Sequence, residues 1–136
     1  MDASLIATAR VCLEGAESGA MTFPQVVERL MVEGFEGYAV DFRRAEATYY
    51  RPDGDSVVLS LRRDETPIAP SLDVAAVQAA IREAQRMAAG YTYAGFCAKV
   101  RTAGCAGYMV SFSGRRAVYF GRTAEIHVEL FPALAP

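Results

Sequence analysis

The sequence predicts an α+β fold: a two-layer sandwich with pseudo-twofold symmetry, built by an internal duplication. Two observations lead to this prediction. Residues 22–59 match residues 92–129 without a gap, with nine identities in 38 pairs, where composition alone would give roughly two or three. Within each segment, an apolar period of three to four residues gives way to a period of two, which indicates a helix followed by strands.

The identical pairs fall mostly on turn glycines and apolar strand positions. They are Thr22/Thr92, Gly34/Gly104, Gly37/Gly107, Tyr38/Tyr108, Val40/Val110, Phe42/Phe112, Ala47/Ala117, Tyr49/Tyr119 and Val58/Val128. We therefore expect one domain over residues 1–136, made of a first repeat (about 3–61), a second repeat (about 71–131) and a connector at 62–70. The connector is polar at its start and contains two prolines, which is typical of a loop.

The first repeat begins with two expected helices. Residues 3–18 carry apolar side chains every three or four positions, and Gly19 closes this helix. Thr22 has the features of an N-cap, and Gln25 completes a capping box for a second helix. Gly34 is expected to end that helix in a left-handed conformation.

A three-stranded meander is expected after each helix pair. In the first repeat its strands are 37–43, 47–51 and 57–61, with a Pro-Asp-Gly turn before the last. In the second repeat a helix after Ser71 ends near Gly90, and the remaining elements are a helix at 92–103 and strands at 106–112, 117–121 and 125–131. The sequence leaves open whether the two meanders form one continuous sheet.

Composition bounds the function. The net charge of −2 argues against nucleic acid and anionic membranes as partners. The three cysteines have no CxxC spacing and read as small buried residues in a reducing compartment. We expect no signal peptide, because the N-terminal residues lack a basic segment before an apolar run, and the sequence has no apolar stretch long enough to span a membrane and no cofactor motif. The expected location is cytoplasmic, without a cofactor.

The only histidine gives one candidate site. In an expected strand, Glu125, His127 and Glu129 share one face and Ile126 and Val128 the other. Such a polar row could contribute to a metal site with ligands from elsewhere, or a carboxylate could orient the imidazole as a general base. The structural alternative is a solvated outer face of an edge strand.

Further candidates come from neighbouring strands and turns. Asp41 is a conceivable donor to the histidine row. Arg122 belongs to a set of turn arginines that could clamp a phosphate or carboxylate, with Tyr50 and Tyr119 as stacking or hydroxyl partners. The alternative is that the arginines are turn charges neutralised by nearby acids and that the tyrosines belong to the core.

Three blocks of sequence resemble the YbcV-like family of small bacterial and prophage proteins, sometimes labelled phage envelope proteins. The blocks are MTFPQVVERLMVEGFEGYAVD, TYYRPDGD and GYMVSFSGRRAVYFGRTAEIHVELFP. The resemblance covers most of the chain from about Glu14 onward. It implies a bacterial, intracellular, stand-alone domain and no particular activity. It matches the family pattern at Tyr38, Asp41, Tyr49, Tyr50, Arg122, Glu125 and His127.

Two functional hypotheses follow from the sequence. The first is a small non-enzymatic binding or regulatory domain that forms a homodimer through an exposed edge or an open sheet face. The second is a small enzyme or metal-binding protein that uses the polar strand around His127, with Arg122 and Tyr119 nearby. The second hypothesis needs His127 in a concave pocket that also holds polar groups from another strand.

Overall fold

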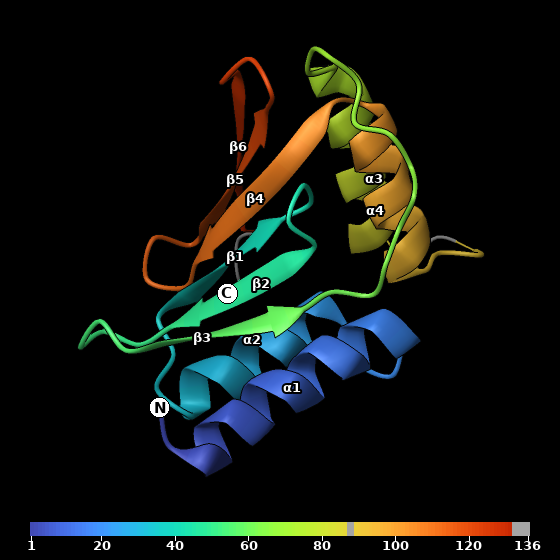
Figure 1. Cartoon of the computed structure of the whole chain (residues 1–136). Coiled ribbons are helices and arrows are strands. Elements are labelled where there is room, and N and C mark those ends of the chain that lie inside the picture. Colours follow the sequence, from blue (N-terminus) through green and yellow to red (C-terminus); the bar gives the residue numbers. More distant parts are fainter. Residues whose placement is uncertain (87–88, 132–136) are drawn as a thin grey trace.

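The computed structural model describes residues 1–86 and 89–131, which form four helices and one six-stranded antiparallel sheet (Figure 1). The expected α+β class is confirmed. In chain order the elements are α1 (Ala3–Ser18), α2 (Phe23–Val32), β1 (Gly37–Asp41), β2 (Glu46–Tyr50), β3 (Ser56–Ser60), α3 (Val74–Gln85), α4 (Tyr93–Thr102), β4 (Cys105–Ser111), β5 (Arg116–Gly121) and β6 (Ile126–Leu130).

Local signals in the sequence place the helix ends. The Thr22 hydroxyl accepts from the Gln25 N–H at 3.3 Å, and the Gln25 side chain accepts from the Thr22 N–H at 2.8 Å, so the expected capping box is present. Gly34 has a φ of 88° beyond the end of α2. In the second half, α3 starts later than Ser71 because Asp73 is its N-cap. Residues 87–88, within the expected last turn of that helix, lie outside the described residues.

The sheet is continuous, which answers the question that the sequence left open. Its strand order is β3-β2-β1-β4-β5-β6, so the two meanders join through β1 and β4 at the centre. There Ala39 lies opposite Met109 in an antiparallel pair. Figure 1 shows β1 and β4 crossing the middle of the sheet, with β3 and β6 at its two edges.

The strand registers of the first half recur at the matching positions of the second half. Tyr38 lies opposite Tyr49 in the first half, and Tyr108 lies opposite Tyr119 in the second. The outer pairs agree in the same way, because Thr48 faces Val58 and Val118 faces Val128. The helices α2 and α4 also begin and end at matching positions. We call two residues at matching positions of the two halves counterparts.

One face of the sheet belongs to the hydrophobic core. Tyr38, Tyr49, Tyr108 and Tyr119 are buried there, and each half stacks its two tyrosine rings, with centroids 5.4 and 5.2 Å apart. The helices contribute buried side chains to the same cluster, among them Cys12, Leu30, Val77 and Val100. The opposite face of the sheet carries the alternate strand residues, and it includes the exposed apolar side chains of Val58, Met109, Ile126, Val128 and Leu130. No helix in the described part of the chain has both the length and the apolar character needed to cross a membrane.

Candidate functional site

His127 lies on β6 and faces the interior side of the sheet. It is opposite Tyr119 of β5 in the strand register, and the two rings are 6.5 Å apart. Its Nε2 is 2.9 Å from a carboxylate oxygen of Glu129, and its side chain is only 12% exposed. The carboxylate fixes the orientation of the imidazole, an arrangement that a general base also uses.

The expected row of three polar side chains is therefore only partly formed. Glu125 precedes β6, so the strand contributes His127 and Glu129 alone. The alternative of a solvated outer face is wrong for these two residues, because the outward positions of β6 are the apolar Ile126, Val128 and Leu130. No group of three or more metal-ligating side chains that could hold an ion occurs among the residues described.

Glu125 and Arg122 lie in the turn between β5 and β6, where both hold the segment that leads from the first half to the second. The Glu125 carboxylate accepts from the backbone N–H of Leu72 at 3.3 Å and from the Thr123 hydroxyl. Arg122 donates to the carbonyl oxygen of Ile68 at 3.2 Å. These contacts give both side chains a structural role.

Asp41 and Tyr50 lie apart from the histidine. The Asp41 carboxylate accepts from the backbone N–H groups of Arg43 and Arg44 at 2.9 and 3.2 Å, and so closes the turn after β1. Tyr50 is exposed at the last position of β2, at the other end of the β1–β2 pair. The structure thus brings together His127, Glu129 and Tyr119, and it separates them from Asp41 and Tyr50.

Several turn arginines have their guanidinium groups engaged by the chain. Arg44 pairs with Glu46 at 3.1 Å, and Arg51 donates to the carbonyl oxygen of Glu33 at 2.9 Å. Arg116 donates to the carbonyl oxygen of Gly114 at 3.1 Å. These contacts favour the interpretation of turn charges over that of a phosphate clamp.

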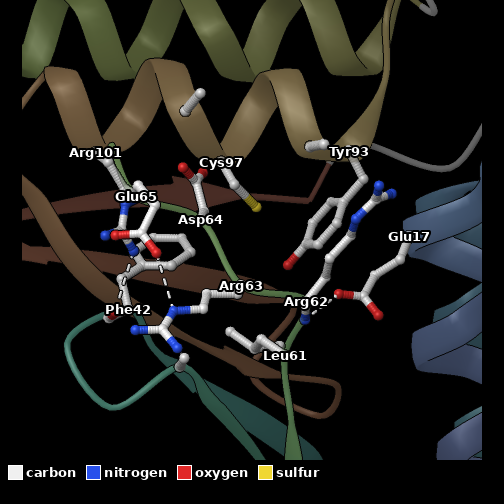
Figure 2. A pocket seen from close by; sticks show the side chains of 13 residues that line it. Glu17, Phe42, Leu61, Arg62, Arg63, Asp64, Glu65, Tyr93, Cys97 and Arg101 are labelled. Atoms are coloured by element: carbon white, nitrogen blue, oxygen red, sulfur yellow. Dashed lines mark hydrogen bonds and ion pairs between the residues drawn. The ribbon is translucent and has the colours of Figure 1, made fainter. Parts of the chain in front are cut away.

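A cavity of about 360 Å³ lies between α4, the turn after β1, the end of α1 and the start of the connector (Figure 2). It is lined by Glu17, Phe42, Ala45, Leu61, Arg62, Arg63, Asp64, Glu65, Tyr93, Ala94, Cys97, Ala98 and Arg101. Sequence reasoning missed this site, because its walls come from both halves and the connector. One signal was available: the counterparts of Ala45 and Leu61 in the second half are larger residues.

Arg101 fixes the inner wall of the cavity. Its Nε donates to the Thr66 carbonyl oxygen at 2.7 Å and its Nη1 donates to the Phe42 carbonyl oxygen at 3.0 Å. The guanidinium carbon also lies 5.6 Å from the centre of the Phe42 ring. On the opposite side, the Tyr93 hydroxyl is 2.8 Å from that of Tyr108. Directed hydrogen bonds therefore fix Arg101 and Tyr93 in the wall of the cavity.

The acidic groups at the rim already have partners. Glu17 accepts from the backbone N–H of Arg62 at 2.7 Å, and Glu65 pairs with Arg63 at 2.9 Å. Burial raises the pKa of the Asp64 carboxyl, but hydrogen bonds from Thr66 and the Arg101 charge outweigh burial and leave this pKa below its ordinary value. Asp64 is thus ionised at neutral pH.

The cysteines are free and buried, as expected. Cys97 lines the cavity, and burial raises the pKa of its thiol to about 12. Burial likewise raises the pKa of Cys105 to about 11. Because the thiolate is the reactive form, neither thiol is poised for nucleophilic chemistry at neutral pH.

No protein-family model matches the chain, and no curated protein matches it either. The resemblance to the YbcV-like family therefore stays a prediction from the sequence blocks.

Proposed function

We propose that the chain is a small non-enzymatic binding or regulatory domain that self-associates through the uncovered face of its sheet. The observation that carries this proposal is that the apolar side chains of β6 point outward and its polar side chains point inward. Its outward side chains Ile126, Val128 and Leu130 are 61%, 40% and 61% exposed. Its inward side chains are the polar His127 and Glu129.

The matching edge strand β3 is more polar on its outer face. There the exposed Ser56 and Ser60 flank one exposed apolar residue, Val58, while Leu59 is buried on the inner face. Polar-out and apolar-in is the expected pattern for a strand with one solvated face. An edge strand with apolar side chains directed outward indicates that another surface covers them.

The apolar surface continues from β6 across the sheet. One row of cross-strand neighbours on the uncovered face consists of Val58, Thr48, Ala39, Met109, Val118 and Val128. The midpoint of this row is the Ala39–Met109 pair. A surface with an approximate twofold at its centre suits a second copy of itself, because a twofold dimer uses the same patch on both subunits.

Charge also favours a second copy as the partner. The first half of the uncovered face carries Asp41 and Glu46, whereas the counterpart of Glu46 in the second half is Arg116. In a twofold dimer Glu46 of one copy can lie near Arg116 of the other, a charge pair that would help to fix register, although Glu46 already pairs with Arg44 within its own copy. From strand spacing, six strands of at least five residues cover roughly 1,000 Å² per pair of copies, which is below the usual size of a specific interface. We therefore expect a concentration-dependent dimer.

We also infer that the two halves are copies of one helix-helix-three-strand unit, arranged as a two-layer sandwich about a pseudo-twofold axis. The support is that one offset in residue number relates α2 to α4, β3 to β6 and the strand registers of the two halves. Left-handed φ values recur at the counterparts Ala45 and Arg115, at 54° and 53°. A shared backbone conformation at an uncommon φ is more specific than shared element order.

The competing hypothesis of an enzyme or metal site at His127 has less support. His127 lines neither the cavity of Figure 2 nor the smaller cavity beside Tyr91 and Thr92. Tyr119 and Glu129 lie beside it, but two other residues expected to assist it are elsewhere, since Asp41 closes a turn and Arg122 holds the connector. A paired and largely buried imidazole is equally compatible with a structural role.

The test is sedimentation equilibrium from micromolar to millimolar protein, with Val128→Glu and Met109→Glu compared with the wild type. Val32→Glu is the matched control, because Val32 is 76% exposed on α2, away from the sheet face. We expect wild type and Val32→Glu to form dimers at the higher concentrations and both face variants to stay monomeric. A monomeric wild type throughout, or dimers in both face variants, would refute the proposal.

A further inference from the structure

We propose that the cavity lined by Phe42, Leu61, Tyr93 and Cys97 is a binding site for a small aromatic molecule that carries one carboxylate group. The site is independent of self-association, since its walls are α4, the turn after β1, the end of α1 and the start of the connector, and none of them lies on the uncovered face of the sheet. Either proposal can therefore fail without the other.

The size and walls of the cavity suit such a ligand. Its volume of about 360 Å³ is at the lower end of the range of small-molecule sites, which is roughly 300–1,000 Å³. The side chains of Phe42, Leu61, Tyr93, Ala94 and Cys97 give it an apolar interior. Aromatic walls favour a flat apolar body, which gains both burial and ring contacts.

At the corresponding positions of the other half, larger side chains of the chain itself meet one another. Phe131, the counterpart of Leu61, packs edge-on against Phe23, the counterpart of Tyr93, with ring centroids 5.7 Å apart. Arg115, the counterpart of Ala45, lies 5.8 Å from the Phe131 ring. Because Leu61 and Ala45 are shorter than their counterparts Phe131 and Arg115, they leave room for a ligand in the first half. An aromatic ring is thus the group that the same architecture accommodates elsewhere.

The rim charges favour an anionic ligand. The three acidic side chains there each have a partner. Glu17 accepts from the Arg62 N–H, Asp64 accepts from Thr66 and lies in the field of Arg101, and Glu65 pairs with Arg63. Among the residues described, the Arg62 guanidinium forms no ion pair with any of them. Arg63 and Glu65 are 89% and 84% exposed, so their pair contributes little and can exchange its partner. The Arg62 guanidinium, and that of Arg63 once its exposed pair opens, are therefore the rim groups that can bind a carboxylate of a ligand.

The position of Arg62 defines how the ligand lies. In Figure 2, Arg62, Tyr93 and Glu17 occupy one end of the cavity, and Arg101, Arg63 and Glu65 occupy the other. The Arg101 guanidinium is already committed to two backbone carbonyl groups. A carboxylate is therefore expected at the Arg62 end, with the aromatic body extending toward Phe42.

The test uses three probes of similar size and different charge: naphthoate, naphthylmethanol and naphthylmethylammonium. Binding is followed by titration calorimetry and by amide chemical shifts. Leu61→Phe fills the cavity with the side chain that the chain carries at position 131. Phe131→Leu is the matched control, because it makes the reverse exchange at the filled site. Arg62→Gln removes the rim charge.

We expect saturable binding of naphthoate in preference to the other two probes, with shifts centred on α4 and the connector. Leu61→Phe should weaken it at least about tenfold, and Phe131→Leu should leave the affinity for this cavity unchanged. Arg62→Gln should lower the affinity for naphthoate by about two- to fivefold, as expected for the loss of one exposed ion pair, and should leave the affinity for naphthylmethanol unchanged.

Three results would overturn the assignment: no saturable naphthoate binding, equal or tighter binding of the ammonium probe, or undiminished binding to Leu61→Phe. Circular dichroism and thermal unfolding establish that each variant is folded. If Leu61→Phe does not fold, Ala98→Leu on α4 narrows the same cavity and decides the question by the same criterion.

Discussion

Ala39 of β1 lies directly opposite its own counterpart, Met109 of β4, at the centre of the sheet. Around this pair each half meets the other in the same way: Tyr38 lies opposite Val110, and Val40 lies opposite Tyr108. A valine–tyrosine pair therefore lies on each side of the central Ala39–Met109 pair. This arrangement lets substitutions at matched positions be compared within one protein.

Val40→Ala and Val110→Ala are expected to destabilise the fold by similar amounts. Both valines are almost completely buried, so each substitution removes two methyl groups from a packed core and should cost about 2–3 kcal/mol. Urea unfolding of each variant measures the change in stability. Val32→Ala, at an exposed position of α2, serves as the control and should change stability by less than about 0.5 kcal/mol. A difference above about 1.5 kcal/mol between the two core variants would contradict a centre packed alike on both sides.

The fold could be predicted from the sequence where contacts between neighbouring residues determine the ends of helices and the positions of turns. The Thr22 capping box, the left-handed Gly34 and the Pro-Asp-Gly turn each involve neighbouring residues, so their elements were found close to the observed bounds. The pairing of β1 with β4 depends on contacts between residues far apart in the chain. No local pattern specifies such contacts, and the sequence therefore left the continuity of the sheet open.

The candidate site shows a second limit. Alternation in β6 correctly separated His127 from Ile126 and Val128, but a period of two does not say which side faces the core. A comparison with β3 would have raised the question of which side of β6 faces the core, because the apolar Val57 and Leu59 are the counterparts of His127 and Glu129. The cavity was missed for another reason: its size depends on which side chains at positions 45, 61 and 93 meet across separate elements.

Gly104→Ala is expected to destabilise the protein more than Gly19→Ala. Both glycines have left-handed φ values, 92° and 81°, which cost an alanine about 1–2 kcal/mol. A Cβ at Gly104 would also overlap the carbonyl oxygen of Ser71, whereas a Cβ at Gly19 meets open space. The comparison of urea midpoints checks this order. Equal destabilisation in both variants would mean that the backbone around Ser71 shifts without cost.

Stability is expected to fall in alkaline solution because of the buried thiols. Burial raises the pKa of Cys105 to about 11 and that of Cys97 to about 12, from an ordinary value of 9.0. The folded protein therefore keeps these protons to higher pH than the unfolded chain. The contribution of the two thiols to the free energy of unfolding is complete below about pH 9. Above that pH it declines, at up to about 1.4 kcal/mol per thiol per pH unit.

Urea unfolding of wild type and Cys105→Ala between about pH 8 and pH 10.5 isolates one thiol from the tyrosines that titrate in the same window. The variant should be less stable at pH 8, because it lacks a buried side chain that donates to the Gly107 carbonyl oxygen. Its stability should then decline less steeply with pH than that of the wild type. Parallel pH profiles would show that the Cys105 thiol titrates alike in the folded and unfolded states.

Arg101→Gln is expected to release the connector. The guanidinium joins Thr66 of the connector to Phe42 at the end of β1 through hydrogen bonds of 2.7 and 3.0 Å. Hydrogen bonds from a charged donor contribute about 1.5–3 kcal/mol, and this side chain also packs on the Phe42 ring. Without these hydrogen bonds, the backbone around Glu65 should open more often and become a better substrate for a glutamate-specific protease.

Limited proteolysis under native conditions measures this opening, with the cleavage site identified by mass spectrometry. Arg122→Gln is the matched control, because Arg122 holds the same connector through one exposed hydrogen bond of 3.2 Å to Ile68. We expect cleavage after Glu65 to accelerate strongly in Arg101→Gln and only slightly in Arg122→Gln. Equal acceleration in both variants would mean that the connector is held mainly from the Ile68 side, and the wall of the cavity would then not depend on Arg101.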